Sequence, residues 1–89
     1  MAVLVTADVP GQTEAGYDGM RAMLGESMRT APGLVLHTAH PIEGGWRIIE
    51  IWESKEEATA YFARFVHPNL PPGIKPRRTL QELHRLVRP

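Results

Sequence analysis

One carboxylate, Glu50, lies in the middle of an aromatic and apolar segment, WRIIEIW (46–52). Side chains alternate between the two faces of a β-strand, so Glu50 shares a face with Trp46, Ile48 and Trp52. A mostly apolar surface with few polar groups is typical of a small-molecule pocket. Desolvation there disfavours the charged carboxylate, so Glu50 can act as a general acid or base near neutral pH. The alternative is a dimer core in which both tryptophans are buried and Glu50 reaches solvent or pairs with an arginine.

The opposite face of the same segment carries Ile49 and Ile51. We expect these two side chains to pack under helices, which leaves the Glu50 face to line the space between two sheets. Aromatic residues on the helix that follows are further candidates for contact with a ligand. The residues predicted to bind a substrate are Trp46, Ile48, Trp52, Tyr61 and Phe65.

Two histidines are candidates for proton transfer beside Glu50, because imidazole titrates near neutral pH. His37 shares a strand face with Val35 and Ala39, and we expect it either in the pocket or at its rim. His84 belongs to the last predicted strand and points either into the pocket or toward the helices. For both, the alternative is a neutral histidine that is hydrogen-bonded within the fold. The predicted catalytic residues are Glu50, His37 and His84.

The histidine spacing predicts no metal site. His37 and His40 are three residues apart, which turns them to opposite faces of a continuous strand. The sequence contains no cysteine and no H-E-x-x-H motif, so the usual ligand patterns for zinc are missing.

The first half of the chain predicts a strand, a helix and a hairpin. Residues 2–7 are apolar and partly β-branched, which predicts a strand. Apolar residues at spacings of three and four predict a helix over residues 14–28. Residues 34–39 and 46–52 predict two further strands, and the Gly-Gly turn between them predicts that they form a hairpin.

The second half predicts a helix and one more strand. Ser54 and Glu57 form a capping box that begins the helix, and Pro68 is expected to end it. Residues 79–87 predict a fourth strand, with a short helix as the alternative. The order β-α-β-β-α-β is typical of the α+β ferredoxin-like fold, an antiparallel sheet with both helices on one face. The uncovered apolar face needs a cover, which predicts a homodimer with two sheets facing each other.

Composition predicts a single domain over residues 1–89. Ten Lys and Arg balance ten Asp and Glu, so no large electrostatic attraction to nucleic acid or to an anionic membrane is available. No apolar run approaches the roughly 20 residues of a membrane span. Without cysteine there is no disulfide framework, and a cytoplasmic location is expected. The basic stretch around Arg77 and Arg78 is expected to be a solvated face or to form ion pairs at a dimer edge.

The segment GGWRIIEIWES (44–54), followed by the acidic helix start KEEA (55–58), resembles the stand-alone members of the antibiotic biosynthesis monooxygenase-like family. This family lies in the dimeric α+β barrel superfamily. The pairs Tyr17-Asp18 and Leu83-His84 add to the resemblance. The resemblance implies a ferredoxin-like fold, a homodimer whose two sheets form a barrel, and chemistry that often uses no metal or organic cofactor.

The resemblance implies roles for few individual residues. Trp52 matches the tryptophan that faces the pocket in haem-degrading and quinone-forming members. Haem-degrading members also use an asparagine on the first strand, where this chain offers Thr6 and Asp8. They place a histidine inside the second helix, where this chain has residues 61–63 (Tyr-Phe-Ala) and only His67 near the helix end. The resemblance therefore disfavours haem degradation.

Together these observations predict a small cofactor-independent enzyme with monooxygenase-like chemistry. Its partner would be a hydrophobic small molecule of aromatic or polyketide type. The protein would desolvate and orient this substrate and move a proton, leaving the substrate to react with oxygen. Two alternatives stay open. The same acid and base groups could run a cyclisation or isomerisation, or the domain could bind a ligand or another protein without chemistry.

Overall fold

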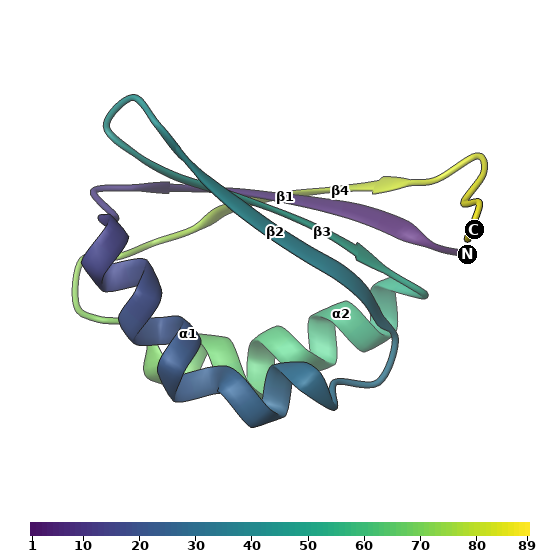
Figure 1. Cartoon of the computed structure of the whole chain (residues 1–89), viewed down its shortest axis with the longest axis horizontal. Coiled ribbons are helices and arrows are strands. Elements are labelled where there is room, and N and C mark those ends of the chain that lie inside the picture. The colour runs from purple at the N-terminus through teal and green to yellow at the C-terminus, as the bar shows by residue number, and fades with distance from the viewer.

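The computed structural model describes all 89 residues and places one antiparallel sheet on two helices (Figure 1). The sheet has the strand order β2-β3-β1-β4, and both helices cover the same face of it. The α+β ferredoxin-like fold and the predicted element order are therefore confirmed. The elements are β1 (Val3–Pro10), α1 (Glu14–Arg29), β2 (Leu34–Ile42), β3 (Gly45–Trp52), α2 (Lys55–Tyr61) and β4 (Arg77–Glu82).

Both helices begin at a side-chain cap. The Thr13 Oγ1 accepts a hydrogen bond from the Gly16 N–H at 3.0 Å and so caps α1. The predicted capping box is present at α2, where the Ser54 Oγ accepts from the Glu57 N–H at 3.1 Å. These bonds satisfy backbone donors that a helix leaves unpaired at its start. Beyond α2 the chain continues as a π-helical turn (Phe62–Val66) and a 3-10 turn (His67–Asn69).

The face of β3 that carries Glu50 packs under the helices, which corrects one prediction. Trp52 is fully buried against Tyr61 and Phe62, with ring centroids 5.5 and 5.8 Å apart. Ile49, which pairs with Thr6 in the register of β1 and β3, lies on the other, helix-free face together with Ile51. The expectation that the two isoleucines pack under the helices is wrong, because the bulky aromatic rings fill that layer instead.

The helix-free face of the sheet is partly apolar. Leu36 is 41% exposed there and pairs with Ile51, which is half-buried. The same face holds a bidentate ion pair, in which the Arg47 guanidinium donates to both carboxylate oxygens of Asp8 at 2.6 and 3.0 Å.

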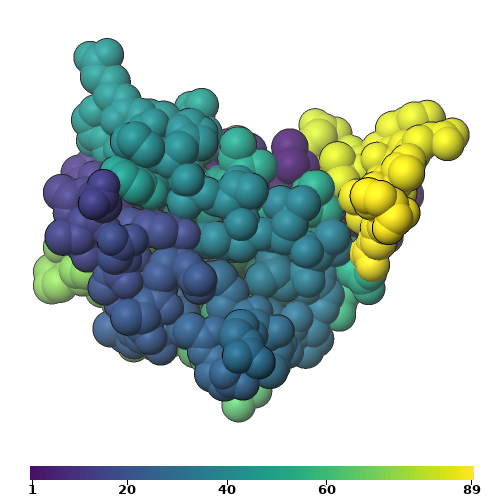
Figure 2. Space-filling view, viewed as in Figure 1, coloured from purple at the N-terminus to yellow at the C-terminus, as the bar shows by residue number.

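The hairpin between β2 and β3 and the C-terminal tail project at either side of the molecule in this view (Figure 2). None of the helices has both the length and the apolar character needed to cross a membrane.

Strand β4 occupies a different range from the predicted 79–87. It pairs with β1 from Arg77, opposite Asp8, to Glu82, opposite Val3. One further backbone bond joins the Leu83 N–H to the carbonyl of Ala2 at 2.9 Å. The strand ends there because β1 offers almost no backbone beyond Val3 with which to pair.

Candidate functional site

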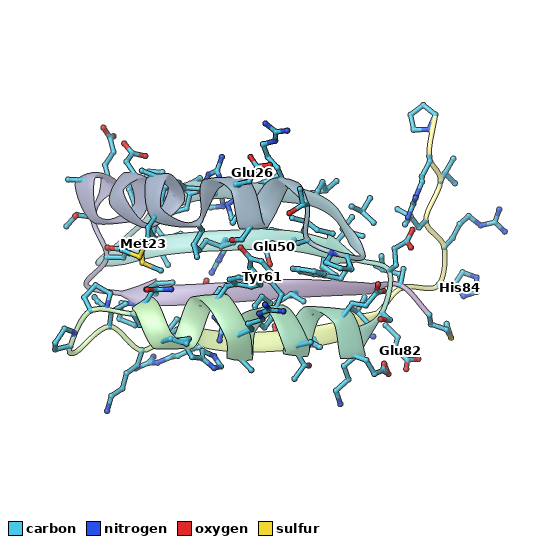
Figure 3. All side chains as sticks on the ribbon, turned by 90° about the horizontal axis from the view of Figure 1, so that it is seen from below. Met23, Glu26, Glu50, Tyr61, Glu82 and His84 are labelled. Carbon is cyan, nitrogen blue, oxygen red and sulfur yellow. The ribbon has the colours of Figure 1, made fainter.

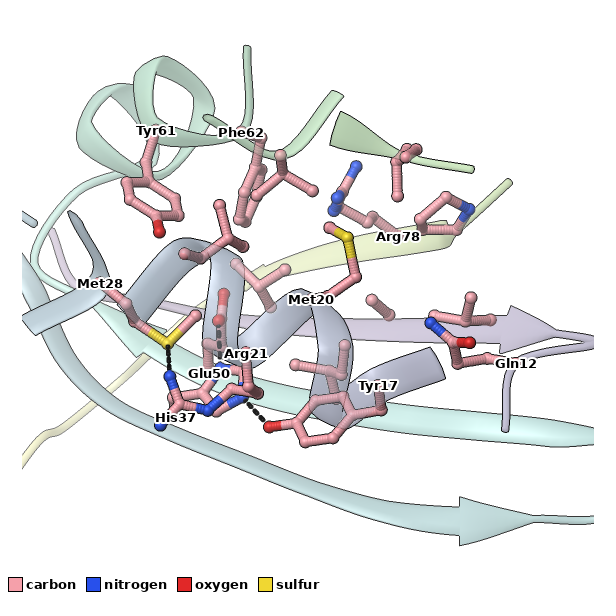
Figure 4. Close-up of a pocket in the computed structure, with 18 of the residues that line it drawn as sticks. Gln12, Tyr17, Met20, Arg21, Met28, His37, Glu50, Tyr61, Phe62 and Arg78 are labelled. Carbon is pink, nitrogen blue, oxygen red and sulfur yellow. Dashed lines mark hydrogen bonds and ion pairs between the residues drawn. The ribbon is translucent and has the colours of Figure 1, made fainter. Parts of the chain in front are cut away.

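A cavity of about 70 Å³ lies between the sheet and the two helices (Figure 4). Thirteen of the 19 residues that line it are hydrophobic. Val5, Ala7 and Val9 of β1 line its sheet side, and both helices and the loop before β4 contribute to the lining. Cavities with this apolar character and a few polar groups are typical of ligand sites.

Three polar side chains along the cavity form a hydrogen-bonded chain. The Glu50 Oε2 lies 2.6 Å from the His37 Nδ1, and the His37 Nε2 lies 2.5 Å from the Tyr17 hydroxyl. Behind them, the Trp52 Nε1–H donates to the Glu50 Oε1 at 3.0 Å. His37 and Glu50 are direct partners in the register of β2 and β3, and Tyr17 comes from α1, which covers the same face of the sheet.

The chemistry of these groups fixes the positions of the protons. An indole nitrogen can only donate, and an ionised carboxylate can only accept. In the neutral imidazole the Nδ1–H of His37 therefore donates to Glu50, and its Nε2 accepts the hydroxyl proton of Tyr17. This assignment follows from the hydrogen-bond network. Glu50 thus orients His37 and stabilises a positive charge that forms on its ring.

Tyr17 is held in place on both sides. Its ring stacks on His37, with centroids 6.0 Å apart, and on Trp46 at 5.9 Å. Burial raises the pKa of Tyr17 above its ordinary value of 10.0, with a smaller contribution in the same direction from Glu50. The phenol is therefore protonated at neutral pH and can pass its proton to His37 while it receives another.

A cation borders the same cavity at the opposite edge of the sheet from His37. Arg78, on β4, lines the cavity with its guanidinium 4.2 Å above the ring of Phe62. Its NH1 donates to the His67 Nε2 at 2.9 Å, and no carboxylate lies within ion-pair distance of it. Burial lowers the pKa of Arg78, although Glu50 acts in the opposite direction. The expectation of a solvated basic stretch is thus wrong for Arg78, because β4 begins at Arg77 and places Arg78 against Phe62 and His67, which follow α2.

The structure brings two of the three predicted catalytic residues together. Glu50, which is 6% exposed, and His37 both line the cavity and contact each other. His84 is exposed beyond the end of β4, on the tail that turns away from the helices (Figure 3). The expected placement of His84 in the pocket is therefore wrong, because the chain leaves the sheet at Glu82.

Of the predicted substrate-binding residues, two line the cavity and three lie behind its lining or outside it. Ile48 and Tyr61 line the cavity. Trp52 supports Glu50 from behind, and Trp46 backs Tyr17 with an indole Nε1 that is buried without a hydrogen-bond partner. Phe65 packs against Tyr61, with centroids 5.1 Å apart, and does not line the cavity.

Sequence reasoning missed Tyr17 and Arg78 as members of the site. Tyr17 belongs to the apolar face of the predicted first helix and to the resemblance, and that position on the helix was the available signal for a place in the site. Nothing local in the sequence distinguishes Arg78 from Arg77.

The structure contains no cluster of three or more His, Asp or Glu residues that could hold a metal ion.

No family model and no curated protein matches this sequence. Among solved structures, SnoaB, a cofactor-independent oxygenase from Streptomyces nogalater, is 14% identical over 97% of this chain and 96% of its own, with a TM-score of 0.67. A candidate antibiotic biosynthesis monooxygenase from Deinococcus radiodurans is 13% identical over 99% of this chain and 97% of its own, with a TM-score of 0.62. The fold is that of the antibiotic biosynthesis monooxygenase-like proteins. The haem degrader MhuD from Mycobacterium tuberculosis, with two haems bound, is also similar, at 18% identity over 98% of this chain and 99% of its own, with a TM-score of 0.58.

Proposed function

We propose that this protein is a small enzyme that acts on a hydrophobic, aromatic molecule and moves a proton through Tyr17 to His37, while Glu50 stabilises the charged imidazole ring. We further propose that the reaction is monooxygenase-like and needs no cofactor. The observation that carries the proposal is the continuous chain of 2.5 and 2.6 Å contacts at the edge of an apolar cavity. Such a chain serves acid–base chemistry, whereas a purely structural core needs no titratable relay.

The relay would act on a hydroxyl group of the substrate, an enol or a phenol. The substrate hydroxyl donates its proton to the Tyr17 oxygen while Tyr17 donates its own proton to the His37 Nε2. The resulting imidazolium lies beside the Glu50 carboxylate, which stabilises the new charge. The substrate is left as an electron-rich anion in a cavity that excludes most water.

An electron-rich anion of this kind can reduce dioxygen, which is the co-substrate of the proposed reaction. Electron transfer and recombination form a carbon–oxygen bond and give a peroxide anion. His37 returns the proton through Tyr17 and so gives a hydroperoxide. Where the oxygenated carbon carries a hydrogen, that hydrogen leaves as a proton, the O–O bond breaks, and the proton and the departing hydroxide form water, which leaves a carbonyl. One substrate and one dioxygen thus give one oxidised product and one water. The fold that this chain shares with SnoaB, a cofactor-independent oxygenase, supports this choice of chemistry.

A haem-degrading function, as in MhuD, does not fit the residues of this site. Tyr61 and Phe62 of the second helix are buried against Trp52 and offer no imidazole there. His67 is exposed and accepts a hydrogen bond from Arg78.

Oxygen uptake with a panel of hydroxylated polycyclic aromatics tests the proposal. We expect one dioxygen consumed per substrate, and we expect Glu50→Gln and His37→Ala to abolish turnover. His40→Ala is the matched control, because His40 is an exposed histidine of the same strand whose ring bonds only the Pro41 carbonyl. Loss of activity in His40→Ala but not in His37→Ala would contradict the proposal.

The same relay could instead run a cyclisation or isomerisation, which needs proton transfer but no oxygen. Unchanged turnover under anaerobic conditions would favour this second candidate. Binding without turnover over the whole panel would favour a ligand-binding protein. His84→Ala should leave turnover unchanged in each case, because that side chain is exposed away from the cavity.

We also propose that the helix-free face of the sheet pairs with a second copy, as the sequence predicts. Leu36, Ile49 and Ile51 make this face partly apolar, and no element of the chain covers it. Light scattering of Ile51→Lys should report a monomer where the parent protein reports a dimer. A monomeric parent protein would contradict the pairing. A cytoplasmic location stays a prediction from the sequence.

A further inference from the structure

We propose that the cavity takes its ligand as an anion, an aromatic carboxylate or an equally acidic aromatic oxygen acid, whose negative group pairs with Arg78. This inference names the substrate class of the site and rests on the proposed function for the identity of that site. It is carried by a guanidinium that lines an apolar cavity and has no carboxylate partner in the fold.

The charges around the cavity favour a negative ligand. Its lining holds two arginines, Arg21 and Arg78, and one carboxylate, Glu50. Both oxygens of Glu50 already accept hydrogen bonds, from Trp52 and His37. Arg21 is exposed, so solvent screens its charge. The half-buried Arg78 is therefore the cation with which an anionic ligand can pair.

The interactions of Arg78 within the fold leave room for such a group. Its NH1 donates to the Nε2 of the neutral His67 ring, and its Cζ lies over the ring of Phe62. Neither contact supplies a compensating negative charge, and a half-buried cation without one is costly. A carboxylate can accept two parallel hydrogen bonds from a guanidinium. The lowered pKa of Arg78, which burial causes, is consistent with this unmet need.

The placement of Arg78 also sets the shape of the ligand. Arg78 and His37 lie on the two edge strands of the sheet, β4 and β2, and both face the helices. Three strand spacings separate the edge strands, which is about 14 Å between backbones. The two groups lie in different parts of the cavity, with Met20 between them in the close-up (Figure 4). A ligand with fused rings could thus place a hydroxyl at Tyr17 and an acid group at Arg78.

The observed cavity must widen to admit such a ligand. About 70 Å³ is room for about five water molecules. Met20 and Met28 line the cavity, and methionine side chains adapt their shape at low cost. We therefore expect the ring system to enter by displacing these thioethers, while the two polar ends of the cavity stay in place.

A matched pair of probes tests the proposal without any turnover. 1-Naphthoate and 1-naphthamide have the same rings and nearly the same shape, and only the first carries a charge. We expect the parent protein, studied by calorimetry at low salt, to bind the acid about tenfold to a hundredfold more tightly than the amide, as for a charged hydrogen bond. Arg78→Gln should remove this preference, and Arg78→Lys should retain part of it.

Arg77→Gln is the control, because it removes the same charge from the neighbouring position on the helix-free side. It should keep the full preference for the acid. Equal affinity for acid and amide, no binding of the acid at millimolar concentration, or a preference that survives Arg78→Gln would overturn the inference. These results are independent of oxygen uptake, so a failed relay with an intact preference for the acid, or the reverse, can be told apart.

Discussion

Replacement of Glu50 tests whether its carboxylate holds the site together. In Glu50→Ala the Trp52 indole N–H and the His37 Nδ1–H lose their acceptor at a position that is only 6% exposed. Each buried polar group left without a partner costs about 1–3 kcal/mol. The expected loss in the free energy of unfolding is therefore about 2–6 kcal/mol, a large fraction of the stability of a small domain.

Glu50→Gln keeps the shape of the side chain and can keep both partners. Its amide oxygen accepts from Trp52, and its NH₂ group donates to His37 once that ring adopts its other tautomer. The cost is the charge assistance of two hydrogen bonds, about 1 kcal/mol each, and it is partly offset because no charge is buried. We expect a loss of less than about 2 kcal/mol.

Urea unfolding of both variants, followed by tryptophan fluorescence at one protein concentration, gives the two free energies of unfolding. The reasoning requires Glu50→Ala to be clearly the less stable of the two. Equal stability of Glu50→Ala and Glu50→Gln would refute it, because the hydrogen bonds of Glu50 would then contribute nothing that water or a rearranged core cannot replace.

Three further predictions concern pH and helix capping. Burial raises the pKa of Tyr17 above 10.0. The stabilisation that comes from burying the protonated phenol is therefore complete below pH 10 and is lost as the pH rises further. In urea unfolding, Tyr17→Phe should lose less stability than the parent protein above pH 10. The hydrogen bond from Arg47 lowers the pKa of Asp8 below 3.8, so this ion pair stabilises the fold above that pH and is lost below it. Asp8→Asn should therefore lose less stability than the parent between about pH 5 and about pH 3, and an equal loss would contradict the assignment. Ser54→Ala should cost about 1 kcal/mol and lower the midpoint of thermal unfolding by about 4–8 °C, whereas an unchanged midpoint would show that the cap is dispensable.

The order of the elements could be predicted because its signals are local. Apolar spacing, turn glycines and the Ser54–Glu57 capping box each act within a few residues. The end of β4 could not be predicted in this way. It depends on where its partner β1 runs out of backbone near Val3, which is a property of the pairing and not of residues 79–87.

The choice between the two faces of β3 needed tertiary information. Alternation separates the Glu50 face from the Ile49 face, but both are apolar enough to be buried. The structure decides it through Tyr61 and Phe62, whose rings pack on Trp52. The clustering of aromatic residues in 46–52 and 61–65 was the signal that could have favoured the correct face.

The candidate site was predictable only in part, because sequence patterns show which residues stand out on a strand but not how the elements pack. Glu50 and His37 can be found from the sequence, because each is a polar residue among apolar neighbours on its own strand. Their direct contact depends on the register of β2 and β3. Tyr17 and Arg78 reach the cavity from α1 and β4, far away in sequence, and only the packing of these elements on the sheet brings them there.

The tautomer of His37 tests the central claim most directly. Nitrogen-15 NMR of the four histidines, with His37 assigned from the His37→Ala spectrum, distinguishes a protonated from an unprotonated ring nitrogen. The account predicts that neutral His37 carries its proton on Nδ1, facing Glu50, and that the proton moves to Nε2 in Glu50→Gln. A neutral His37 protonated on Nε2 in the parent protein would contradict it, because that nitrogen could then accept no proton from Tyr17.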